Sequence, residues 1–97
     1  MSTTFEWDKK KAKANRKKHK IAFEEAATVF NDPFIADMPD PDHSEVEPRQ
    51  IAIGYSIKRR LLVVIYTERE DNIRIISCRK ATPSELKIYE EDKIENT

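Results

Sequence analysis

The chain has 97 residues, of which 38% are apolar and 37% are charged, and its formal net charge is zero. This length fits one domain with a thin core, so we expect a single domain over residues 1–97. No apolar run is long enough to cross a membrane, the first residues lack the apolar stretch of a signal peptide, and the one cysteine excludes an internal disulfide. We therefore expect a cytoplasmic protein.

Charge is segregated along the sequence although the net charge is zero. Residues 1–20 carry a balance of +6 and residues 49–80 a balance of +5, whereas residues 21–48 carry −8 and no basic residue. Residues 81–97 carry −3. Two basic segments on either side of an acidic one are either solvated surface or a site that attracts a polyanion.

The N-terminal third predicts a short strand and a pair of helices. Residues 5–7 alternate in polarity, and Asp8 suits the N-cap of a helix over about residues 9–18. This helix is rich in lysine and has almost no apolar face, so it is either solvated or presents its cations to a partner. A second helix is predicted over about residues 22–31, ending before Pro33, because apolar side chains recur there with helical spacing. They are Phe23, Ala26, Ala27 and Phe30.

Four segments with strand patterns follow, and the short connections between the last three predict antiparallel hairpins and a meander. The segments are residues 34–38, 49–55, 61–67 and 73–79. The third is a continuous apolar run, which predicts a central strand buried on both faces. Residues 39–48 are acidic and punctuated by prolines, and they predict a loop.

The C-terminal segment predicts a helix with a defined start. Thr82-Pro83-Ser84-Glu85 combines a capping threonine, a proline at the first helical position and the glutamate of a capping box. Leu86 and Tyr89 can then face the core, and we expect the acidic tail to fray from about residue 91. The order β-α-α-β-β-β-β-α predicts an α+β fold, in which an antiparallel sheet packs with an N-terminal helix pair and a C-terminal helix.

Several kinds of site have no signature in the sequence. Gly54 is the only glycine, so no glycine-rich loop can hold a nucleotide phosphate. One cysteine and two distant histidines give no zinc spacing, and no G-x-S-x-G motif is present. We expect no metal and no cofactor, which leaves a cofactor-free enzyme or a binding module.

Basic side chains gather in the predicted strands and their turns. One hairpin turn holds Lys58, Arg59 and Arg60, and the last strand and its end hold Arg74, Arg79 and Lys80. Neighbours in a strand point to opposite faces, so we expect Arg79 to share a face with Ile75 and Ser77. Arg74 should then share the other face with Cys78 and Lys80.

Arg79 has two possible roles. It stands just before a predicted helix N-terminus, whose free N–H groups and positive dipole end suit a phosphate. The alternative is a structural ion pair with Glu24, Glu25 or Glu85, which is common for an arginine at the edge of a core.

Other side chains with possible chemistry have simpler structural interpretations. His19 could transfer protons, or it could interact with free carbonyls at the end of its helix. His43 lies in the acidic loop and is expected to be solvated. Phe5 and Trp7 are expected to belong to the core and not to stack on bases, and Cys78 is expected to be a buried small side chain and not a nucleophile.

Beyond these features, a series of motifs runs along the chain. It opens with Phe5-Glu6-Trp7-Asp8-x-x-Lys11-x-x-x-Asn15-x-x-Lys18-His19-x-Ile21-x-Phe23-Glu24-Glu25-Ala26. It continues with Asp32-Pro33, Asp42-His43-Ser44, Arg49-x-Ile51-x-Ile53-Gly54, Leu62-Val63-Val64, Tyr66-Thr67-Glu68-Arg69 and Ile73-Arg74-Ile75-Ile76-Ser77-x-Arg79-Lys80-Ala81-Thr82. In this colinear series, over about residues 5–91, the chain resembles the BrnT family.

The resemblance implies a fold similar to that of the RelE-type ribonuclease toxins of bacterial type II toxin–antitoxin systems. It implies RNA cleavage that arrests translation and growth, and neutralisation by a BrnA-type antitoxin encoded beside the toxin. It also implies a toxin–antitoxin hetero-oligomer that binds promoter DNA only through the antitoxin.

Such toxins need no metal, because the 2′-hydroxyl of the RNA attacks the neighbouring phosphate. For this reaction we expect Arg79 to stabilise the oxyanion, Lys80 and Arg74 to hold phosphate, and His19 or Lys9 to transfer a proton. Further RNA contacts are expected from Lys58, Arg59 and Arg60.

Three residues depart from the family pattern. Lys20 and Glu70 stand where glycine is usual, and Cys78 stands where alanine is usual. Glu70 also adds negative charge near the expected basic face, which concerns activity more than fold. Two other functions remain open from the residues: a non-catalytic nucleic-acid-binding module, favoured if the basic residues spread over a flat face, and a protein-interaction domain.

Overall fold

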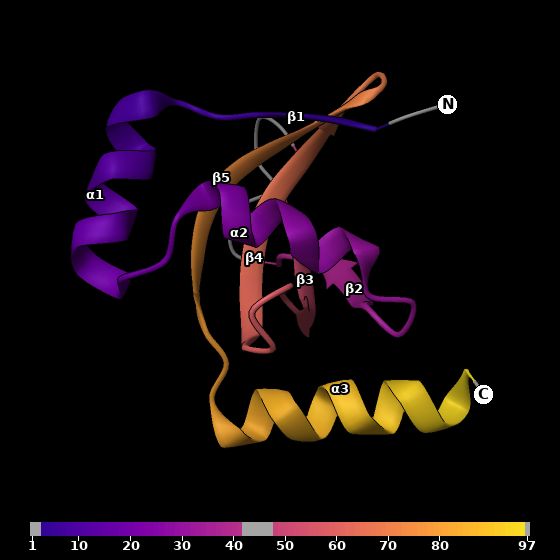
Figure 1. Cartoon of the computed structure of the whole chain (residues 1–97). Coiled ribbons are helices and arrows are strands. Elements are labelled where there is room, and N and C mark those ends of the chain that lie inside the picture. The colour runs from indigo at the N-terminus through magenta and orange to yellow at the C-terminus, as the bar shows by residue number, and fades with distance from the viewer. Residues whose placement is uncertain (1–2, 42–47, 97) are drawn as a thin grey trace.

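The computed structural model of the chain describes residues 3–41 and 48–96. Its elements are β1 (Thr4–Glu6), α1 (Lys9–His19), α2 (Phe23–Thr28), the 3₁₀ helix η1 (Val29–Asn31), β2 (Ala36–Pro39), β3 (Gln50–Tyr55), β4 (Leu61–Arg69), β5 (Asn72–Lys80) and α3 (Pro83–Glu95) (Figure 1). This order confirms the predicted α+β fold. His43, the Asp42-His43-Ser44 motif and most of the predicted acidic loop lie outside the described residues.

The five strands form one sheet in the order β1-β5-β4-β3-β2. The pairs β2–β3, β3–β4 and β4–β5 are antiparallel, as the short connections predict, and β4 is central with buried side chains toward both faces. β1 differs, because it pairs parallel with β5 at the edge of the sheet. Connection lengths predict only hairpins between successive strands, so they gave no indication of this pairing between the two ends of the chain.

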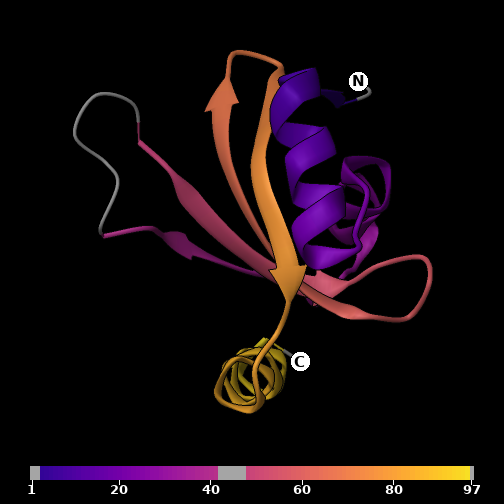
Figure 2. The same ribbon diagram turned by 90° about the vertical axis from the view of Figure 1, so that its left-hand side faces the viewer.

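The helices lie on both faces of the sheet. α1 and α2 cover one face, as Figure 2 shows, and α3 passes the end at which β5 finishes. The larger core lies beneath α1 and α2 and includes Phe23, Ala26, Val64, Tyr66 and Cys78. The smaller core lies on the α3 side, where α3 packs against β2 and β3 and Tyr89 is buried. The predicted apolar face of the second helix therefore packs on the sheet as expected.

Two polar side chains hold the lysine-rich helix α1 in place. The Asp8 carboxylate accepts hydrogen bonds from two N–H groups of the first turn, at 2.8 and 3.1 Å, which confirms the predicted N-cap. Asn15 is buried; its Nδ2 donates to the carbonyl oxygen of Ile21 at 3.2 Å, and its Oδ1 accepts from the N–H of Cys78 at 3.1 Å. Because this anchor is polar, the apolar pattern of the sequence gave no sign of it.

α3 begins as predicted and extends further. The Glu85 N–H donates to Thr82 Oγ1 at 3.3 Å, and the Thr82 N–H donates to Glu85 Oε1 at 2.8 Å, so the capping box is confirmed. The helix runs to Glu95, which corrects the expectation that the tail frays from about residue 91. The Lys93 ammonium lies 4.7 Å from the centre of the Phe34 ring, and this cation–π contact ties the last turns of the helix to the chain before β2.

Two of the departures from the family pattern lie at positions with left-handed backbone. Lys20 has a φ of 62° at the end of α1, and Glu70 has a φ of 53° in the β4–β5 turn. Glycine adopts this conformation without the steric cost of a side chain, which explains why it is usual at both positions.

We expect Lys20→Gly and Glu70→Gly each to raise the free energy of unfolding by up to about 1 kcal/mol, because relief of the strained backbone exceeds the added entropy of the unfolded chain. Urea denaturation of the single variants measures this. Lys17→Gly, in the last turn of the same helix α1, where φ is negative, is the control and should lower the stability by up to roughly 0.5–1 kcal/mol. A loss of stability in all three variants would contradict the interpretation.

Candidate functional site

An irregularity in β5 decides where its arginines point. Ser77 pairs with Ile65 of β4 and Ile75 pairs with Tyr66, so that Ile76 has no partner. Such a bulge interrupts the alternation of side chains along a strand, and bulges are frequent beside active sites. Residues before Ile76 therefore point to the face opposite to the one that uninterrupted alternation from Arg79 predicts.

The bulge places Arg74, Ser77 and Arg79 on the same face of the sheet. Their partners in β4, at positions 67, 65 and 63, alternate with the β4 side chains that enter the larger core, so all three residues lie on the α3 side. The expected grouping was wrong: Arg74 shares its face with Arg79, and not with Cys78 or Lys80. We call these three partly exposed residues of β5 the arginine face.

Arg79 forms a two-point ion pair with Glu85 in the first turn of α3. Its Nη1 donates to Oε1 and its Nη2 to Oε2, both at 2.7 Å, and Nη1 also lies 3.3 Å from the carbonyl oxygen of Lys80. The Arg79 guanidinium lowers the pKa of the Glu85 carboxyl to about 2 by hydrogen-bonding to its charged form. Of the ion pairs considered for Arg79, the one with Glu85 is therefore present.

The ion pair leaves one edge of the Arg79 guanidinium open. Its Nε makes no hydrogen bond to any residue within 3–41 and 48–96, and its side chain is 43% exposed. The edge formed by Nε and Nη2 can hold two oxygens of a phosphate while Glu85 holds the other edge. The start of α3 is less open than expected, because Thr82 and Glu85 cap it and Pro83 has no N–H.

Arg74 lies on the same face with a weaker partner. Its Nη1 is 3.5 Å from Oε2 of Glu6 in β1, and both side chains are partly exposed. Ion pairs at such exposure contribute little, so a phosphate can replace the carboxylate at small cost. Along β5, Arg74 and Arg79 are separated by roughly 15 Å, a span that one RNA strand can cover.

Lys80 and His19 lie on the opposite side of the sheet, the side that α1 and α2 cover (Figure 2). Lys80 pairs with a residue of β4 whose side chain belongs to the larger core. His19, the last residue of α1, follows by one helical turn the anchor residue Asn15, and therefore lies on the side of α1 toward the end of β5. The structure brings Arg79, Lys80 and His19 to one end of β5, but not to one face.

The hairpin turn between β3 and β4 separates its three cations. The Arg60 guanidinium turns toward α2, where Nε donates to Glu25 Oε2 at 2.9 Å and Nη2 donates to Oε1. Ser56 Oγ donates to the same carboxylate at 2.7 Å, and the pKa of the buried Glu25 is lowered, chiefly by the hydrogen bond from Arg60. Arg60 thus ties the hairpin to α2, whereas Lys58 and Arg59 are exposed and make no such contact with Glu25.

Cys78 is buried in the larger core, and burial raises the pKa of its thiol to about 12. A thiol that stays protonated at neutral pH is a poor nucleophile. The structure confirms the prediction of a buried small side chain.

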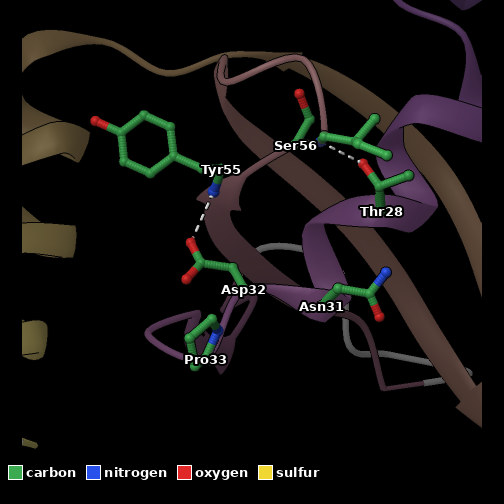
Figure 3. A pocket seen from close by; sticks show the side chains of 7 residues that line it. Thr28, Asn31, Asp32, Pro33, Tyr55 and Ser56 are labelled. Carbon is green, nitrogen blue, oxygen red and sulfur yellow. Dashed lines mark hydrogen bonds between the residues drawn. The ribbon is translucent and has the colours of Figure 1, made fainter.

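A pocket of about 380 Å³ lies beside the end of β3 (Figure 3). Asp32 Oδ2 accepts hydrogen bonds from the N–H of Tyr55 at 2.9 Å and the hydroxyl of Tyr89 at 2.8 Å, and Oδ1 accepts from the N–H of Phe34 at 2.9 Å. The lining residues include no cation: they are Thr28, Asn31, Asp32, Pro33, Tyr55, Ser56 and Ile57. A phosphate would meet the Asp32 carboxylate here, so this pocket does not suit RNA.

A second pocket, of about 330 Å³, lies between α1 and the start of α2. We call it the α1 groove, and its lining residues are Trp7, Lys9, Ala12, Lys13, Arg16, Ala22, Phe23 and Glu24. Lys9 is one of the site residues that the sequence predicts, whereas Lys13 and Arg16 are not. The spacing of the three cations in the sequence could have identified them, since residues at i, i+4 and i+7 lie on one side of a helix. Trp7 packs on the core as predicted, with 6.0 Å between the centroids of its ring and the Phe23 ring. It also lines the groove.

No cluster of three or more His, Cys, Asp or Glu able to bind a metal ion occurs among residues 3–41 and 48–96. None of the helices in those ranges is long and apolar enough to cross a membrane.

Comparisons with known proteins agree with the motifs. No curated protein matches the sequence. The crystal structure of the Brucella abortus ribonuclease toxin BrnT is similar in fold, with a TM-score of 0.61 and 21% identity over 84% of this chain and 99% of that chain. Residues 7–85 match the family model of the ribonuclease toxin BrnT of type II toxin–antitoxin systems. The chain therefore belongs to the BrnT family of ribonuclease toxins.

Proposed function

We propose that this chain is a metal-independent endoribonuclease that cleaves RNA at the end of β5 that carries Arg79, and so arrests translation. The observation that carries the proposal is the bulge at Ile76. It places Arg74 and Arg79 on one face, where the open Nε edge of Arg79 is free to bind a phosphate.

The reaction that fits this site is attack by the 2′-hydroxyl on the adjacent phosphorus. The bond to the 5′-oxygen of the next nucleotide breaks, and a 2′,3′-cyclic phosphate remains. Negative charge on the phosphate oxygens grows in the transition state, and a fixed guanidinium stabilises it without reorganisation. In this proposal Arg79 stabilises that charge, and Arg74 holds a neighbouring phosphate.

The 2′-hydroxyl must lose its proton and the leaving 5′-oxygen must gain one. We propose Lys80 and His19, at the end of β5, for these transfers. Lys80 follows Arg79 directly, and His19 lies at the same end from α1. Both can contact RNA that passes over the end of the sheet from the arginine face to the side of α1. Lys9, at the far end of α1, is reassigned to RNA binding, because it lies in the α1 groove.

The experiment is incubation of the purified chain with bulk RNA in the presence of a chelator. We expect cleavage, with 2′,3′-cyclic phosphate ends detected by end-specific ligation or mass spectrometry. Dependence on added metal would refute the proposed mechanism. Intact RNA with retained binding would support the alternative, a non-catalytic nucleic-acid-binding module.

We further propose that a BrnA-type antitoxin encoded beside the toxin neutralises it by covering the arginine face. Membership of a type II toxin–antitoxin family supports a protein partner, and exposed arginines attract an acidic segment as they attract RNA. Promoter DNA would then be bound only through the antitoxin, in a hetero-oligomer. The partner should abolish cleavage in the same assay, and a complex that leaves Arg74 and Arg79 open to solvent would contradict occlusion.

A further inference from the structure

We infer that the α1 groove is a second RNA-binding site, separate from the arginine face, which holds a single-stranded segment of the RNA by base stacking and phosphate contacts. The inference rests on the proposed function only in taking RNA as the ligand. It requires no cleavage.

The first observation is the unpaired charge of α1. The helix reads Lys-Lys-Lys-Ala-Lys-Ala-Asn-Arg-Lys-Lys-His and contains no acidic residue. Within residues 3–41 and 48–96, none of its lysines or its arginine forms an ion pair, whereas Arg60, Arg74 and Arg79 all do. Like charges at i, i+4 on a helix destabilise it, so this density of cations is costly unless a polyanion binds.

The second observation is the shape and composition of the groove. Lys9, Lys13 and Arg16 follow one side of α1 at i, i+4 and i+7, with neighbouring side chains about 5–6 Å apart. The groove volume of about 330 Å³ is in the range of ligand pockets. Trp7 lines the same groove, and it is held edge-on against Phe23 with an angle of 81° between the rings. A fixed aromatic ring beside a row of cations is the arrangement by which proteins bind single-stranded nucleic acid.

The indole favours RNA over an acidic protein segment as the occupant. Carboxylates need only the cations, whereas a nucleobase also uses the aromatic ring. Glu24, at the start of α2, is the one acidic residue in the lining, and three cations outweigh it. RNA bound at the end of β5 near His19 could continue along α1 to this groove, since α1 leads from one to the other.

Trp7 is the only tryptophan of the chain and reports on this groove alone. The probe is a 12-nucleotide single-stranded RNA with 2′-O-methyl groups, which cannot be cleaved. We expect its binding to quench the Trp7 fluorescence, and the logarithmic salt slope of the affinity to be negative. In the variant Lys9→Gln/Lys13→Gln/Arg16→Gln the affinity should fall at least about tenfold. The slope of log affinity against log salt concentration should become less negative by about 2, as expected for the loss of three phosphate contacts at about 0.7 each.

The matched control is Lys10→Gln/Lys17→Gln/Lys18→Gln, which removes the same charge from the same helix but outside the groove. It should retain the quench and change the slope by less than about 1. Glu24→Gln should tighten binding, because it removes the opposing carboxylate. Circular dichroism verifies that each variant is folded.

Three results would overturn the inference: saturable binding without a change in Trp7 fluorescence, equal losses in the groove variant and the control, or equal quenching by polyglutamate of matched charge. The last would assign the groove to an acidic protein. Cleavage is measured separately on a short RNA that cannot reach from β5 to the groove. Loss of the groove signal with cleavage intact refutes only the second site, and loss of cleavage with the signal intact refutes only the proposed catalysis.

Discussion

Arg79→Ala is expected to lower the rate of RNA cleavage by at least about a hundredfold and to abolish growth arrest. Removing one preorganised donor from a developing oxyanion costs about 10²–10³ in rate in enzymes of known mechanism. Arg79→Lys should recover little, because an ammonium cannot hold Glu85 on one edge and a phosphate on another. The measurements are single-turnover cleavage at neutral pH, where Glu85 is charged, and growth after induced expression.

The structural role of Arg79 is expected to be small. Its ion pair with Glu85 is 43% exposed on the arginine side, and such pairs contribute about 0–1 kcal/mol. The melting temperature of Arg79→Ala should therefore fall by no more than about 8 °C. A collapse in melting temperature that matches the loss of activity would identify Arg79 as a structural residue. Full cleavage by a well-folded Arg79→Ala protein would remove it from the site.

Arg60→Ala is expected to have the largest effect on stability. It leaves the Glu25 carboxylate, only 4% exposed, with Ser56 as its remaining side-chain partner. Loss of one partner of a buried ion pair costs about 3–5 kcal/mol, and the 30% exposure of Arg60 places the expected loss nearer 2–4 kcal/mol. The melting temperature should fall by roughly 10 °C or more, measured by calorimetry.

Lys58→Ala is the matched control, since it removes a cation from the same turn where the side chain is exposed. Its stability should change by less than about 0.5 kcal/mol. The double variant Glu25→Leu/Arg60→Met should lose less stability than the sum of its two single variants, because it leaves no buried charge. Weakened RNA binding by a fully stable Arg60→Ala protein would instead support the prediction that Arg60 contacts RNA.

The local signals of the sequence predicted most of the fold. The strand and helix order, the Asp8 and Thr82 caps and the buried central strand β4 each follow from patterns that span a few residues. Such signals depend on nearest neighbours along the chain, so they survive in the tertiary structure. The parallel pairing of β1 with β5 had no local signal, because the two strands lie at opposite ends of the chain.

The candidate site was predicted as a set of residues but not as an arrangement. Alternation along β5 assigned Arg74 and Arg79 to opposite faces, and the bulge at Ile76 brought them together. A bulge arises from the register between two strands, which depends on how both pack against the core. One unpaired residue was enough to reverse the expected faces.

By itself the sequence determined which residues carry charge, where α1 and α3 begin, and the family to which the chain belongs. The tertiary structure alone decided which arginines are available. Arg60 meets Glu25 from 35 positions away, and Arg79 meets Glu85 across the turn into α3 with one edge left open. The physical reason is that the partner of an arginine and the sheet face on which it lies depend on how distant segments pack together. A periodic pattern along the chain contains no information on that packing.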